Sequence, residues 1–87
     1  MIIIVTVRDE DDQERTFSDE KVILQYKATL GGRSIEIERT NDDGIAVFHL
    51  DDCSVDTREE VTFEVRNVDY GPYEVEDGDD NIFTISI

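Results

Sequence analysis

Residues 33–50 have the sequence RSIEIERTNDDGIAVFHL, and this stretch decides the fold class. In 33–39, apolar and charged side chains alternate, which puts Ile35 and Ile37 on one side and two glutamates on the other. A period of two is typical of a strand with one buried face. The alternation therefore predicts a strand whose two isoleucines enter a core.

A turn and a second strand follow directly. The run NDDG, from Asn41 to Gly44, combines residue types that favour a chain reversal. Residues 45–50 then alternate again, which predicts that Ala46, Phe48 and Leu50 point inward. The side chains left on the outer face are Ile45, Val47 and His49.

The same kind of segment recurs along the whole chain, and no segment has clean helical periodicity. We expect strands at 1–8, 21–28, 33–39, 45–50, 61–66 and 82–87, with a short additional strand at 73–76. Together they turn about eighteen side chains inward. Over 87 residues this predicts one domain, 1–87, that is all-β and built from six or seven short, mostly antiparallel strands.

Residues 38–50 resemble a recurring element of immunoglobulin-like and transthyretin-like sandwiches. Carboxypeptidase regulatory-like domains have it as a threonine, here Thr40, an acidic turn that ends in glycine, and a strand with small or aromatic inward residues. Residues 61–71 are similar to the strand and tyrosine-containing turn that follow it there. The resemblance implies a single immunoglobulin-like β-sandwich that binds or spaces other proteins without catalytic residues. The purely polar, acidic loop 9–14 departs from the family pattern.

The charge of the chain is extreme. It has 23 acids and 8 bases, a net charge of -15, and more Arg than Lys. Such charges repel one another and oppose compaction, whereas salt near 1 M shortens the Debye length to about 3 Å and removes much of the penalty. We therefore expect a protein adapted to concentrated salt. The alternative is an acidic domain with a basic partner. Nucleic acid and anionic membrane surfaces are excluded as partners, because both require clustered bases.

The sequence offers no catalytic constellation. His49 is the only histidine and Cys53 the only thiol. Nucleophilic catalysis needs a base beside the nucleophile, and no sequence motif supplies that pair. A thiolate among so many carboxylates is disfavoured, so Cys53 should be unreactive. We expect no enzyme activity.

One acidic loop resembles the start of a calcium site. Asp77, Asp79 and Asn81 match the opening of a calcium-binding loop, but Ile82 occupies the position of the turn glycine and no bidentate glutamate follows. We expect no cofactor beyond loosely bound cations, and a small calcium-dependent binding module remains an alternative.

Several outward positions are apolar in this very acidic chain. If alternate residues of the first strand enter the core, Ile2 and Ile4 point outward, as do Ile45, Val47 and His49. These five residues are the predicted protein interface, unless the domain itself covers both faces of those strands. The expected partners are other protein subunits, in a homo-oligomer or symmetric assembly.

These features predict a non-enzymatic structural or interaction protein. The chain shows no signal for export and no membrane span, although such sandwiches commonly work on exteriors. The most specific hypothesis is an accessory protein of a halophilic archaeal virus particle, located in the virion, that decorates or cements the capsid protein. The alternative is a cytoplasmic, immunoglobulin-like adaptor subunit of a protein complex.

Overall fold

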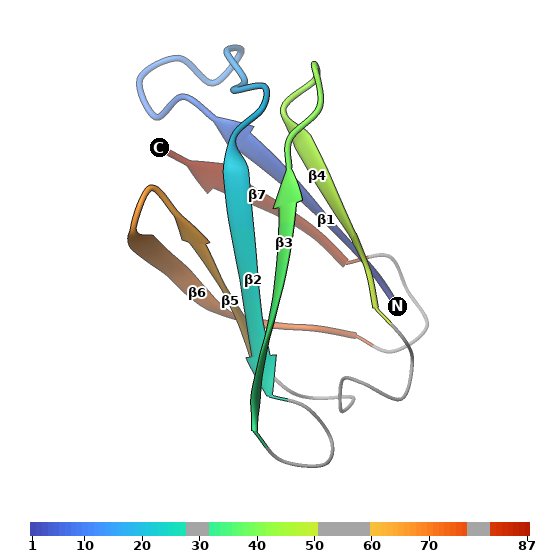
Figure 1. Ribbon diagram of the computed structural model, residues 1–87. Coiled ribbons are helices and arrows are strands. Elements are labelled where there is room, and N and C mark those ends of the chain that lie inside the picture. The colour runs from blue at the N-terminus through green and yellow to red at the C-terminus, as the bar shows by residue number, and fades with distance from the viewer. Residues whose placement is uncertain (28–31, 51–59, 77–80) are drawn as a thin grey trace.

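The computed structural model describes residues 1–27, 32–50, 60–76 and 81–87, which form seven strands in two sheets (Figure 1). One sheet has the order β4-β1-β7 and the other the order β3-β2-β5-β6. The prediction of an all-β fold is confirmed. The strands are β1 (Ile2–Arg8), β2 (Lys21–Lys27), β3 (Arg33–Arg39), β4 (Ile45–His49), β5 (Glu60–Val65), β6 (Val68–Glu74) and β7 (Asn81–Ser86).

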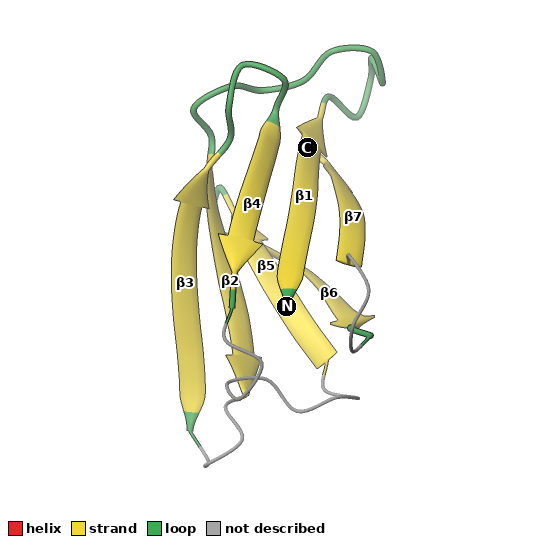
Figure 2. Cartoon of the chain, turned by 90° about the vertical axis from the view of Figure 1, so that its right-hand side faces the viewer, coloured by secondary structure: helices red, strands yellow, loops and turns green. Residues whose placement is uncertain are grey.

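Strand β1 lies at the centre of the three-stranded sheet (Figure 2). It pairs antiparallel with β4 and parallel with β7. In the other sheet β2 pairs antiparallel with both β3 and β5, and β5 pairs antiparallel with β6. Strands β3, β6, β4 and β7 are therefore the edges.

The core lies between the two sheets, and both contribute alternate side chains to it. Phe63 of β5 is fully buried at its centre, with its ring centroid 6.3 Å from Phe48, 5.9 Å from Tyr73 and 5.5 Å from Phe83. Tilted aromatic pairs at such distances add stability beyond the area that they bury. The buried apolar residues are Ile3, Val5, Val7, Val22, Leu24, Tyr26, Ala46, Phe48, Leu50, Val61, Phe63, Val65, Val75 and Ile85.

The prediction for the side chains of β3 was wrong. Ile35 and Ile37 are each 56% exposed, because they lie opposite Gln25 and Ile23 on the outer face of the sheet. Cross-strand neighbours share a face, and the buried side chains of β2 are instead opposite Ser34, Glu36 and Glu38. Strand β3 is the edge of the wider sheet, and its glutamates stay exposed on the side that faces the other layer.

The turn between β3 and β4 carries the chain from one sheet to the other. Asn41 Oδ1 accepts hydrogen bonds from the backbone N–H groups of Asp43 at 2.9 Å and Ile45 at 3.1 Å. Gly44 has a φ of 76°, a conformation that favours glycine, and a Cβ there would lie 2.4 Å from Thr16 Cβ. The buried Thr40 hydroxyl donates to Phe17 O at 2.6 Å. These contacts explain why threonine, asparagine and glycine occupy this turn.

Strand β6 is longer than the predicted short strand 73–76 and begins just after β5. Arg66 and Asn67 form a two-residue turn with φ values of 52° and 63°. That geometry suits right-twisted hairpins but usually requires Asn or Gly at both positions, so Arg66 made the turn hard to predict. The register shifts between Val61 and Phe63, opposite the segment that holds Pro72, and an edge strand tolerates proline there.

Candidate protein-interaction face

The outer side of the three-stranded sheet, called here the three-strand face, is set by alternation along its strands. In β1, Ile3, Val5 and Val7 are fully buried, so the residues between them point outward. The registers of β4 and β7 add their outward residues to the same surface. The ten members are Ile2, Ile4, Thr6, Arg8, Ile45, Val47, His49, Ile82, Thr84 and Ser86.

The structure brings the five predicted interface residues together on this face. Ile2 lies opposite His49, Ile4 opposite Val47, and Thr6 opposite Ile45. On the other side of β1, Ile82 is the parallel partner of Ile4 and is 68% exposed. Ile4, Ile45 and Val47 are half-buried, while Ile2 and His49 are exposed. The role of the five residues as an interface stays a prediction.

No carboxylate belongs to the three-strand face. With 23 acids in 87 residues, ten positions would hold about two or three acids if acids were evenly spread. Charged residues are depleted from the centres of protein interfaces, and apolar side chains are concentrated there. The face therefore has the chemistry of a contact surface on a protein that is otherwise densely negative.

The acidic residues that the structure describes lie on loops, turns and the other sheet. The described residues form three ion pairs that join side chains: Arg15 with Asp9 at 3.5 Å, Arg39 with Asp19 at 3.8 Å, and Arg66 with Glu20 at 3.1 Å. The arginine side chains of all three are more than half exposed, and such pairs contribute little to stability in salt.

The predicted metal ligand Asn81 has a structural role. It is buried, and its Oδ1 accepts a hydrogen bond from Glu76 N at 2.8 Å while its Nδ2 donates to Glu76 O at 3.1 Å. These bonds join the end of β6 to the start of β7. Asp77, Asp79 and Cys53 lie outside the described residues. Within the described ranges, no three His, Cys, Asp or Glu side chains gather as a metal would require.

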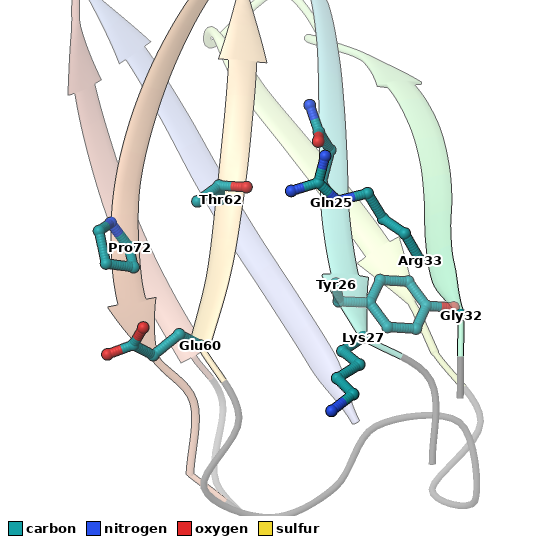
Figure 3. A pocket seen from close by; sticks show the side chains of 8 residues that line it. All are labelled: Gln25, Tyr26, Lys27, Gly32, Arg33, Glu60, Thr62 and Pro72. Carbon is teal, nitrogen blue, oxygen red and sulfur yellow. The ribbon is translucent and has the colours of Figure 1, made fainter. Parts of the chain in front are cut away.

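Sequence reasoning missed a hollow on the outer side of the four-stranded sheet (Figure 3). Its volume is about 420 Å³, and it lies between the strand pairs β2–β3 and β5–β6. The missed signal is that the bases of β2 and β3 are each separated by an even number of residues, which places them on one face. The lining residues are Gln25, Tyr26, Lys27, Gly32, Arg33, Glu60, Thr62 and Pro72.

Comparison with protein-family models, curated proteins and solved structures finds no match for this chain. Within the described ranges, no helix is long and apolar enough to cross a membrane. Function must therefore be inferred from the two outer faces and the charges they carry.

Proposed function

We propose that this protein is a non-enzymatic interaction module that docks onto another protein subunit through the three-strand face. The observation that carries the proposal is the absence of carboxylates from ten neighbouring outward positions in a chain with 23 acids. The partner surface is uncharged and aliphatic, because a charged surface would lose its hydration against these isoleucine and valine side chains without gaining an ion pair.

The size of the face favours a role within an assembly. Three strands about 4.8 Å apart and about 20 Å long give a face of roughly 300 Å². A standard interface buries about 800 Å² on each partner. A single contact of this size is weak, and it becomes stable when many such contacts form together. This supports a subunit that binds in many copies, as a decoration or cement protein of a virus particle would.

The charge distribution supports a salt-adapted role. Ion pairs between described side chains use only Asp9, Asp19 and Glu20, while the net charge is -15. Mutual repulsion of this size favours expansion in dilute buffer and is screened in molar salt. The proposed setting is therefore a salt-rich cell or a particle assembled in one.

For the fold family we propose the transthyretin-like alternative. In immunoglobulin constant domains the first, second, fifth and fourth strands share one sheet and the other three strands share the second. Here β1 and β4 lie with β7, whereas β2 and β5 lie with β3 and β6. The arrangement differs from the constant domain by the exchange of whole strands between sheets, while it keeps the two-layer sandwich that the resemblance implies.

Site-specific photo-cross-linking in the expressing cell tests the proposal. A photoreactive amino acid at Ile82 or Thr84 should give a discrete cross-linked product with one other protein, and the added substitution Val47→Asp should abolish it. The matched control places the same photoreactive group at Asp42, which is exposed in the β3–β4 turn. Equal products from Asp42, or none from either position on β7, would contradict docking through this face.

Stoichiometry separates the two settings for this function. A particle protein should co-sediment with capsid protein in many symmetric copies, whereas an adaptor subunit should be recovered one-to-one in a soluble complex. Quantitative mass spectrometry of the cross-linked material gives the ratio. A one-to-one ratio would reject the particle role and retain the interaction module.

A further inference from the structure

The outer face of the four-stranded sheet, called here the four-strand face, is divided by charge. On β2 and β3 the outward residues include four of the eight bases of the chain and no acid: Lys21, Lys27, Arg33 and Arg39. On β5 and β6 the cross-strand pairs are acid against acid, Glu60 with Glu74 and Glu64 with Asp69. The face therefore has a basic half and an acidic half, side by side in one sheet.

The fold does not benefit from this division. Like charges directly opposite each other destabilise a strand pair, whereas opposite charges stabilise it. Here Lys21 lies opposite Arg39 and Lys27 opposite Arg33, although acids are almost three times as frequent in the chain. The described residues contain no ion pair that involves Lys21, Lys27 or Arg33. An arrangement that costs stability within one chain indicates a use outside it.

Four charges lie across the sheet at the end where the β2–β5 pairing stops, beyond Gln25 and Thr62. Lys27 and Glu60 each lie two residues past that last pair and line the hollow. Together with their outer neighbours the row reads Arg33, Lys27, Glu60, Glu74, which is two positive charges followed by two negative ones. The next row contains Ile35, Gln25 and Thr62 and is uncharged.

The hollow lies along these two rows. In Figure 3, Arg33 and Lys27 stand on one side of it and Glu60 and Pro72 on the other. Its volume of about 420 Å³ leaves room for long side chains from a second surface. The exposed Ile35 lies on the same face, in the uncharged row, and would gain from being covered.

We infer that the four-strand face binds the same face of a second copy of this chain, about a two-fold axis parallel to the strands. That rotation lays β3 of one copy over β6 of the other and β2 over β5. The row of two positive and two negative charges in one copy then faces the same row of the other copy in reverse order. Each charge in the row therefore faces a charge of opposite sign. A two-fold axis across the strands would instead lay β3 over β3 and repel. Two-fold contacts of this self-complementary kind are the commonest in homo-oligomers.

Further along the face, the same rotation lays Glu64 and Asp69 of one copy over Ile23 and Ile37 of the other, where no opposite charge meets them. The bases at the opposite end of the face lie beyond this row. Lys21 and Arg39 lie there beside Arg66, whose guanidinium pairs with Glu20 at 3.1 and 3.3 Å. Arg39 is 3.8 Å from Asp19. Ion pairs within the chain thus partly neutralise that end, and the row that contains Lys27 and Glu60 decides how two copies align.

Sedimentation equilibrium tests the inference in the lowest potassium chloride concentration at which circular dichroism shows the full native signal. Four strands cover only about 400 Å², so the expected dimer is weak and forms at high micromolar to millimolar protein. Lys27→Glu and Glu60→Lys should each weaken dimerisation about tenfold or more, because two-fold symmetry repeats each unfavourable contact. An equimolar mixture of the two variants should recover the wild-type affinity as a heterodimer.

Matched controls separate this face from the three-strand face. Arg15→Glu changes the net charge by the same amount as Lys27→Glu but lies off the four-strand face, and it should leave dimerisation unchanged. Val47→Asp, on the three-strand face, should also leave it unchanged. Wild-type protein that stays monomeric at millimolar concentration, a mixture of the two charge variants that fails to associate, or a dimer lost with Val47→Asp would overturn the inference.

Discussion

The orientation of β3 can be tested by one pair of substitutions, because a register change of one residue moves every side chain of a strand to the opposite face. Ile37→Thr on β3 and Ile85→Thr on β7 make the same chemical change and keep the β-branched shape that strands favour. In the structure Ile37 is 56% exposed and Ile85 is 1% exposed. The two variants should therefore differ strongly in stability.

The expected magnitudes follow from burial. Complete burial of an isoleucine side chain contributes about 1.5–3 kcal/mol, and less than half of that area is covered at Ile37, so Ile37→Thr should cost less than about 1 kcal/mol. At Ile85 the substitution removes buried carbon and places a hydroxyl in the core, which should cost about 2–4 kcal/mol. Urea denaturation in molar potassium chloride, followed by circular dichroism, measures both values.

A cost at Ile37 equal to that at Ile85 would refute the orientation of β3. The isoleucines of that strand would then face the core, and the two arginines that share their parity would leave the four-strand face. Such a result would remove the basic half of the proposed dimer contact. It would leave the three-strand face untouched, because β3 contributes no residue to it.

Four further outcomes are expected. Gly44→Ala should destabilise the protein by about 2 kcal/mol or more, because backbone strain adds to the close contact with Thr16. In Gly32→Ala the new Cβ meets nothing within 4 Å, so this variant should cost only about 1 kcal/mol. Thermal unfolding of both variants measures the difference. Asn81→Ala should cost about 1–3 kcal/mol in the same measurement by leaving the Glu76 backbone unpaired, and a neutral result would contradict its bridging role. Lowering the salt from molar to tens of millimolar should reduce the native circular dichroism signal, and an unchanged signal would count against salt adaptation. Millimolar calcium in molar potassium chloride should leave the melting temperature unchanged, and a clear rise would favour the calcium-dependent module.

Most strands were predictable because one physical rule determines them. In β1, β2, β4 and β5 the buried positions alternate as the sequence predicts, since each of these strands has core on one side only. The same rule predicted that Ile2, Ile4, Ile45, Val47 and His49 point outward, and the pairing of β1 with β4 puts them on one surface. The alternation rule cannot predict which strands share a sheet, because the pairing of strands distant in sequence depends on the whole fold.

The two errors also have physical causes. Both alternating sets of β3 contain charged residues, since Arg33 and Arg39 share parity with the isoleucines and Glu36 and Glu38 form the other set. Because β3 is an edge strand that buries little on either side, its apolar residues alone predicted the wrong face as the inward one. The full length of strand β6 was not predicted, because Gly71 and Pro72 are turn residues in most contexts. Here they lie at a bulge on an edge strand.

The two outer faces are proposed to bind different partners, and their placement gives the proposed dimer a geometry. A sandwich has its two outer faces on opposite sides, so joining two copies through their four-strand faces leaves both three-strand faces outward and pointing away from each other. With packed sheets about 10 Å apart, four layers separate those faces by roughly 30 Å. Each three-strand face alone is too small for a lasting contact, but a rigid pair can hold two neighbouring subunits at once, and the second contact then forms at high effective concentration. A dimer of this kind is thus well suited to bridging adjacent subunits of a repeating assembly. It would bind only weakly to a single isolated subunit.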